Sequence, residues 1–252
     1  MFATIGAGKF HNAVLVWKEK VSSVVSDRGW LYFAVFVRSL ATGLIGVLLG
    51  IYLSQLHLGA DGIGIIIGIG LGGAAVATLL ATLYADRVGH RTTLLGIALA
   101  SCVGAVLLSV SAHPIALGFA AFVGMVNGMG RDRGAALVVE QAALPATASD
   151  RERTMVFAKY NVLQDVGHAL GALFAALPSV LQQSGIAELP AFRTSVALYA
   201  MLSFLPVLAY WRLSSTVEAP HLAGAARVSP ETRSILWKIS SLFALDSIAG
   251  GF

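Results

Sequence analysis

Residues 62–94 read GIGIIIGIGLGGAAVATLLATLYADRVGHRTTL, and this stretch decides what kind of fold the chain can have. From Gly62 to Ala85 it carries no charged residue, and about 20 apolar residues are enough for a helix to cross the hydrocarbon core of a bilayer. A short polar segment, 86–91, follows, and a second apolar run begins at Thr93. The stretch therefore predicts two membrane-spanning helices joined by a tight turn.

The composition of the whole chain agrees with this interpretation. Of its 252 residues, 57% are hydrophobic and 12% are charged, whereas a soluble domain carries about 25% charged residues. The net charge of +4 does not indicate nucleic-acid binding, because the basic residues lie between apolar runs and not along one face. Cys102 is the single cysteine, which excludes an intrachain disulfide and a cysteine-based metal cluster.

Similar apolar runs recur along the chain. They cover residues 30–56, 62–85, 93–112, 115–144, 155–181 and 194–211, and a seventh begins at 235 and reaches 252. The predicted fold is an all-α integral membrane protein, with a six-helix transmembrane bundle and the start of a seventh helix. We expect a lead-in at 1–29, the bundle at 30–213, an inter-bundle loop at 214–234 and the truncated seventh helix at 235–252. A second six-helix half could belong to the same chain or to another copy.

The distribution of Lys and Arg predicts the orientation. With the N-terminus in the cytoplasm, 12 basic residues fall in cytoplasmic segments, Arg193 falls outside and four lie within spans. This excess follows the positive-inside rule. The lead-in and the inter-bundle loop are then both cytoplasmic.

Small residues recur at four-residue spacing in three of the predicted helices. The first predicted helix has Gly46 and Gly50. The second has Gly64, Gly68 and Gly72, and the fifth has Gly167 and Gly171. Such faces let helix backbones approach closely. We expect tight packing there, and smooth surfaces of this kind also suit helices that slide past each other.

The turn after the second run, TLYADRVGHRTTL at 82–94, resembles the signature loop of the major facilitator superfamily, G-x-L-A-D-R-x-G-R-R-x-x-L. It matches at Ala85, Asp86, Arg87, Gly89, Arg91 and Leu94, and departs at Thr82, Tyr84 and His90. The resemblance implies a six-plus-six layout and alternating access. It also implies that this loop latches the two bundles in one state, with Asp86, Arg87, Gly89 and Arg91 as the gate. Without the resemblance, Gly89 alone suits a tight turn, because glycine can adopt a positive φ. The alternative to a gate is a loop whose basic residues only fix the orientation of the helices in the membrane.

Eight charged residues fall within the predicted spans, and each would cost several kcal/mol if it faced lipid alone. They are Arg38, Arg131, Asp132, Arg133, Glu140, Lys159, Asp165 and Asp246. Four are basic and four acidic, so complete structural pairing is one interpretation. The other is a transport cavity, for which we select Arg38, Arg131, Asp132, Arg133, Glu140 and Asp165.

The fifth run carries a polar stripe. Asn161, Gln164, Asp165 and His168 follow the spacing i, i+3, i+4, i+7, which places them on one helix face. The stripe predicts either a cavity wall or hydrogen bonds between helices. Asp165 and His168 are both titratable and are our candidates for taking up and releasing a proton.

These observations predict a secondary active transporter of a small solute, proton-coupled and of major facilitator type. Two kinds of transport fit: efflux of a drug or metabolite, and uptake of a polar or anionic solute. The alternative is a non-transporting membrane scaffold or receptor component, whose intramembrane charges only assemble the helices. We see no phosphate loop, zinc motif or nucleophile motif, so we predict no enzyme, no cofactor, no metal and no nucleic-acid partner. The expected partners are the bilayer, the solute, protons and a second six-helix half. The expected location is a bacterial inner membrane.

Overall fold

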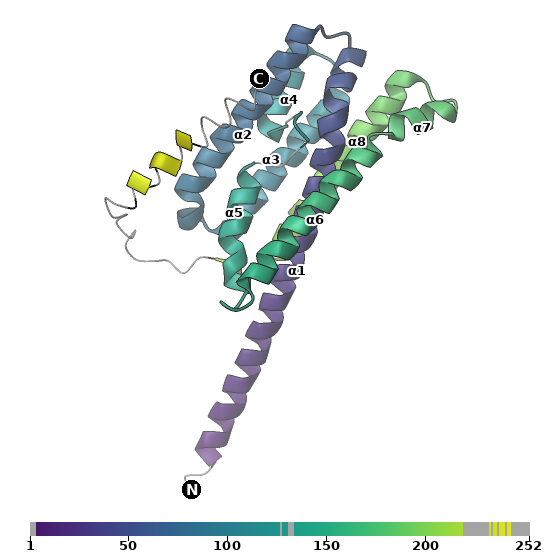
Figure 1. Cartoon of the computed structure of the whole chain (residues 1–252). Coiled ribbons are helices and arrows are strands. Elements are labelled where there is room, and N and C mark those ends of the chain that lie inside the picture. The colour runs from purple at the N-terminus through teal and green to yellow at the C-terminus, as the bar shows by residue number, and fades with distance from the viewer. Residues whose placement is uncertain are drawn as a thin grey trace. The chain divides into compact units, whose positions relative to one another are not determined.

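The structure is a computed structural model, and it describes residues 4–126, 128–130 and 134–218, together with Thr232, Ser234, Ile235, 237–239 and 241–242. Side chains are described from Val25 onward. Most of the described residues are helical, and no described residue lies in a strand. Figure 1 shows these helices and their labels. The predicted site residues Arg131, Asp132 and Arg133, and Asp246, lie outside the described residues.

The helices follow one another with short connections. They are α1 (Thr4–Gln55), α2 (Ala60–Val88), α3 (His90–Val110), α4 (Pro114–Gly124), α5 (Ala135–Ala143), η1 (Leu144–Thr147), α6 (Arg153–Phe174), α7 (Leu177–Gln183), α8 (Glu188–Trp211) and η2 (Ser215–Val217). The predicted lead-in and first span belong to one continuous helix, because α1 runs from Thr4 past Trp30 without a break.

Four of these helices are long and apolar enough to cross a membrane. They are Val25–Gln55 of α1, then α2, α3 and α8. The shorter apolar helices α4 and Ala135–Thr147 follow one another in the chain. The all-α membrane class is therefore confirmed, and the count of six spans stays a prediction.

The fourth predicted span is wrong as a single helix. α4 ends at Gly124, and Met125 adopts a left-handed conformation with φ of 52° that closes its last turn. Gly130 also has a positive φ, 66°, and Gly134 is extended before α5 begins. Glycine destabilises a helix interior by about 1 kcal/mol, so this glycine-rich stretch favours a break.

The fifth predicted span, 155–181, is interrupted as well. α6 ends at Phe174 and α7 restarts at Leu177, with Pro178 in its first turn. Proline lacks the amide hydrogen that a continuing helix needs, but it is accepted at a helix start. The polar stripe of the fifth run therefore belongs to α6 alone.

α1 is the central helix of the N-terminal unit, Met1–Ala219. Its main neighbours are α6 and α8, while α3 packs on α8 and α4, and α2 packs on α4. In Figure 1, α6 runs alongside α1. Two apolar cores form between these helices, one around Leu31, Leu94 and Val139, and one around Leu44, Leu48 and Leu117.

Several glycines let helix backbones come close together, but only some of the glycines predicted to do so make such a contact. Gly167 of α6 faces α1, where an added Cβ would lie 2.6 Å from the Phe36 carbonyl oxygen, and Gly171 faces the Leu40 carbonyl in the same way. Gly46 meets the backbone of Gly130. These three predictions are confirmed.

On α2, by contrast, the prediction selected the wrong face. Gly64, Gly68 and Gly72 have no described atom within 4 Å of an added Cβ, and neither does Gly50 of α1. Gly70 and Gly73 make the contact instead, against the backbone of Val126 and Phe122. The Gly64–Gly68–Gly72 face stays open in this unit.

Residues 220–252 form a second unit. Its described residues, between Thr232 and Leu242, are helical. The predicted inter-bundle loop lies mostly outside the described residues, and the domain boundaries stay predictions.

Candidate functional site

Glu140 is the centre of a buried polar cluster that joins four helices. It lies on α5, and its side chain is fully buried. Arg38 of α1 donates from Nη2 to Glu140 Oε2, and the Tyr160 hydroxyl of α6 donates to the same oxygen at 2.5 Å. The Tyr210 hydroxyl of α8 donates to Oε1 at 2.6 Å. Arg38 and Glu140 were predicted from the cost of placing a charge in a membrane, and the structure brings them together.

The cluster meets the requirement for a buried charge. A buried carboxylate is stable only when an opposite charge and hydrogen bonds replace the water that it loses. Both oxygens of Glu140 have donors, and Arg38, 15% exposed, supplies the opposite charge. The arrangement therefore fits a structural ion pair that fixes α1, α5, α6 and α8 against each other.

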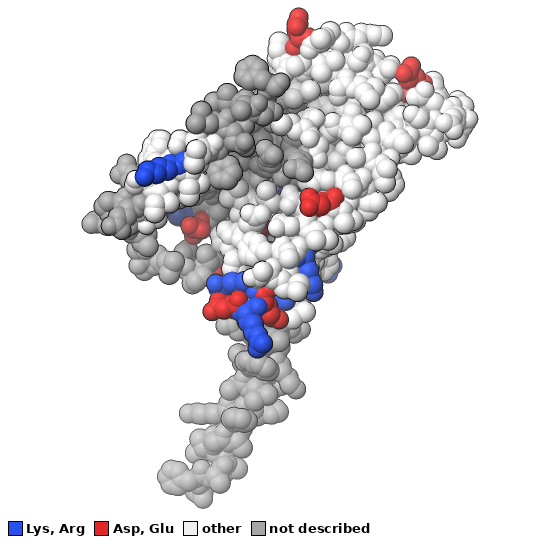
Figure 2. Space-filling model, viewed as in Figure 1, with Lys and Arg blue, Asp and Glu red and all other residues white. Residues whose placement is uncertain are grey.

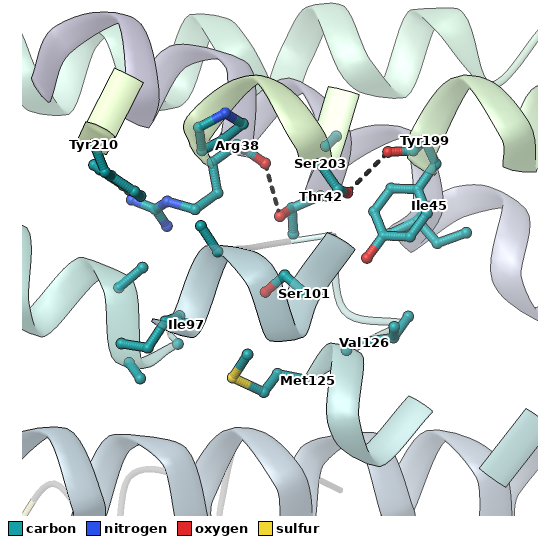
Figure 3. Close-up of a pocket in the computed structure, with 17 residues that line it drawn as sticks. Arg38, Thr42, Ile45, Ile97, Ser101, Met125, Val126, Tyr199, Ser203 and Tyr210 are labelled. Carbon is teal, nitrogen blue, oxygen red and sulfur yellow. Dashed lines mark hydrogen bonds between the residues drawn. The ribbon is translucent and has the colours of Figure 1, made fainter. Parts of the chain in front are cut away.

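A small cavity adjoins the cluster and offers about 70 Å³ to water-sized molecules. Figure 3 shows the Arg38 guanidinium pointing toward Tyr210 at one end. Thr42, Ser101, Tyr199 and Ser203 add hydroxyl groups to walls that are otherwise apolar. Thr42 and Ser203 donate to carbonyls of their own helices, Arg38 O at 2.9 Å and Tyr199 O at 2.8 Å. The hydroxyl groups and the volume of the cavity suit ordered water.

The polar stripe lies on α6, the helix that also supplies Tyr160 to the Glu140 cluster. Asn161 and Asp165 are exposed on this unit, and Gln164 and His168 are half-buried. His168 lies where α6 packs closely on α1, because an added Cβ on Gly43 would meet the His168 carbonyl oxygen.

Charged side chains gather where α5 leads through η1 into α6. Figure 2 shows basic and acidic groups mixed at this end of the unit. Arg28 binds the Thr147 carbonyl and lies 3.6 Å from Glu152, and Arg153 pairs with Asp150 at 3.0 Å. Hydrogen bonds from the hydroxyl and backbone amide of Ser149, followed by the Arg28 charge, lower the pKa of the Glu152 carboxyl. This is the end that the positive-inside rule places in the cytoplasm.

The loop between α2 and α3 is folded against the segment that follows α8. Gly89 has a φ of 99°, as the turn requires. The His90 amide donates to Glu218 Oε2 at 2.7 Å, and Arg91 donates to the Trp211 carbonyl at 2.7 Å. A Cβ on Gly89 would lie 2.6 Å from the Glu218 carboxylate. Asp86 and Arg87 are exposed beside this contact.

Comparison with known sequences agrees with this geometry. The sequence pattern of the Major Facilitator Superfamily matches residues 31–252. The chain belongs to the Major Facilitator Superfamily. It is also 25% identical over 257 residues to the uncharacterized membrane protein YJR124C of Saccharomyces cerevisiae, across 88% of this chain and 57% of that protein.

Membership of this superfamily makes the chain an integral, multi-pass membrane protein of a transporter family. The chain spans little more than half the length of the yeast protein that it matches. The resemblance seen in the signature loop is thereby confirmed, including the Gly89 turn.

Four residues that make contacts in the Glu140 cluster and at the signature loop were not predicted from the sequence. Tyr160 and Tyr210 bind Glu140, and His90 and Glu218 join the signature loop to the chain after α8. A tyrosine inside an apolar run is an available signal, because a buried hydroxyl needs a partner. Glu218 carried no comparable signal, because its contact depends on how the chain returns to α3.

Proposed function

We propose that these residues are the N-terminal half of a secondary active transporter that moves a small solute by alternating access. A second six-helix half would complete the structure, as in other transporters built from repeats. Superfamily membership supports transport in general. The observation that carries the finer proposal is the exposed polar face of α6.

That face needs a polar neighbour. Asp165 is exposed near the middle of a 22-residue helix, in a protein that lies in a membrane. A carboxylate facing lipid costs about 3 kcal/mol or more. Water or the second half must therefore cover it, and a solute pathway between two halves provides both. Asn161 and His168 belong to the same wall.

We assign the coupling ion as the proton. Asp165 and His168 lie within one helical turn of each other on α6, and both can change charge. Arg38 and Glu140 are assigned to helix assembly instead, because Glu140 has donors on both oxygens. Arg131, Asp132 and Arg133 stay candidates for solute contact.

Direction and solute class stay open between drug or metabolite efflux and uptake of a polar or anionic solute. A scaffold is the second candidate, and the fully partnered Glu140 cluster is what favours it. We further propose that the N-terminus is cytoplasmic. A bacterial inner membrane remains our proposal for the location, although the similar protein comes from yeast.

The test uses the full-length protein in liposomes that contain the pH dye pyranine. Gradients of amino acids, sugars, organic anions and cationic dyes are applied one class at a time. We expect one class to change the internal pH, and Asp165→Asn to abolish that change. Asp61→Asn, an exposed acid at the start of α2, should behave as wild type.

Two results would contradict the proposal. If Asp165→Asn left the pH change intact at every pH, the proton role of Asp165 would be wrong. If no class of solute moved, with or without a pH change, the scaffold would be the better account.

A further inference from the structure

His90 is a buried, titratable side chain that the proposed transport cycle does not use. It is the first residue of α3, and its side chain is 4% exposed. The signature loop usually has arginine at this position, so the substitution replaces a permanent charge with one that depends on pH.

Both ring nitrogens of His90 face acceptors. Nδ1 lies 3.1 Å from the Val217 carbonyl oxygen, and Nε2 lies 3.3 Å from Asp86 Oδ1. A carbonyl and a carboxylate can only accept. The doubly protonated ring satisfies both contacts, whereas a neutral ring has one proton for two acceptors.

The two acceptors differ in what they can do when the proton leaves. The Val217 carbonyl contacts the buried ring, and Val217 itself is fully buried. The Asp86 side chain is 84% exposed and can turn into water. The remaining proton therefore stays on Nδ1, and the Nε2 lone pair repels the Asp86 carboxylate.

Other charges of the described residues surround this contact. Arg87 lies next to Asp86 on α2, Arg91 follows His90 on α3, and Glu218 follows η2. Glu218 accepts from the His90 backbone amide, and Arg91 donates to the Trp211 carbonyl. Asp27 of α1 binds Ser214, farther along the same segment. The backbone contacts hold α3 to the segment after α8 in both charge states of the ring.

We propose that His90 is a proton-operated switch on the signature loop: its protonated ring holds Asp86 within this unit, and its neutral ring releases Asp86. The switch rests on the proposed function, together with the gate role that the signature loop implies for Asp86. A released Asp86 is available to the second half, so cytoplasmic pH would set how readily the gate forms.

The first test is ¹⁵N-histidine NMR on the full-length protein in nanodiscs, with His90 assigned from a His90→Gln spectrum. We expect both ring nitrogens to be protonated at low pH and Nδ1 alone at high pH. A neutral ring protonated on Nε2 would overturn the switch.

The second test measures how accessible the signature loop is to a labelling reagent. Val88→Cys, an exposed position at the end of α2, is labelled with a maleimide in a Cys102→Ser background. His90→Arg, which cannot lose its charge, is the matched control at each pH. We expect the labelling rate relative to His90→Arg to fall about threefold from pH 6 to pH 8, because a gate that forms with the released Asp86 covers the loop. A constant ratio would overturn the switch.

These readouts do not depend on solute movement. If both readouts change with pH and no solute moves, the proposed function fails, and the switch fails with it as a control of the gate. If solute moves and both readouts are flat, the switch alone fails.

Discussion

At the scale of the residue, the Arg38–Glu140 pair explains how one acid can be fully buried in this protein. Three donors from three other helices surround the carboxylate. Removing one partner of such a pair leaves an uncompensated charge and costs about 3–5 kcal/mol, whereas removing both costs less.

We therefore predict that Glu140→Leu and Arg38→Leu each lower the free energy of unfolding by about 3 kcal/mol, and that the double variant loses much less than the sum. Unfolding in mixed micelles of increasing SDS fraction measures all three. Purely additive losses would show that the two residues do not act as a pair. Glu188→Leu, at the exposed start of α8, is the control.

Sequence reasoning identified both members of this pair from the cost of charge in a membrane. It did not identify their partners. Helical periodicity shows which residues share a face, but it does not show which helix that face contacts. Asp165 shows the same limit, because periodicity assigned it to one face of a helix without showing what covers that face.

At the scale of the element, glycine determines how closely α1 and α6 approach. Gly43, Gly167 and Gly171 each bring a backbone into contact with the other helix. Adding a large side chain to a filled contact costs about 1–3 kcal/mol or more.

We predict that Gly171→Leu separates α6 from α1 and lowers the free energy of unfolding by about 3 kcal/mol, as overpacking does. Gly96→Leu is the matched control, because Gly96 of α3 has open space around an added Cβ. Unfolding in SDS mixed micelles measures both variants. Equal losses in the two would contradict the close contact.

The elements also show where sequence reasoning stops. The apolar runs predicted α2, α3 and α8 well, because an uninterrupted apolar run of this length forms a single helix in a membrane. They joined α4 to α5 and α6 to α7, since hydropathy does not register the left-handed Met125 or the restart at Pro178. The spacing of Gly64, Gly68 and Gly72 was regular, yet Gly70 and Gly73 make the contact.

Whether the whole molecule is a transporter or a scaffold depends on what covers the polar face of α6. In a transporter, that face lines a pathway that opens to each side of the membrane in turn. In a scaffold, it would be permanently covered by a neighbouring helix.

The most direct measurement is the labelling of Asn161→Cys in the full-length protein with a membrane-impermeant maleimide, added to one side or the other of sealed vesicles. Val166→Cys, on the exposed apolar side of the same helix, is the control, and Cys102→Ser is the background. We predict that Asn161→Cys is labelled from both sides and Val166→Cys from neither. Labelling of Asn161→Cys from one side only, or not at all, would contradict alternating access.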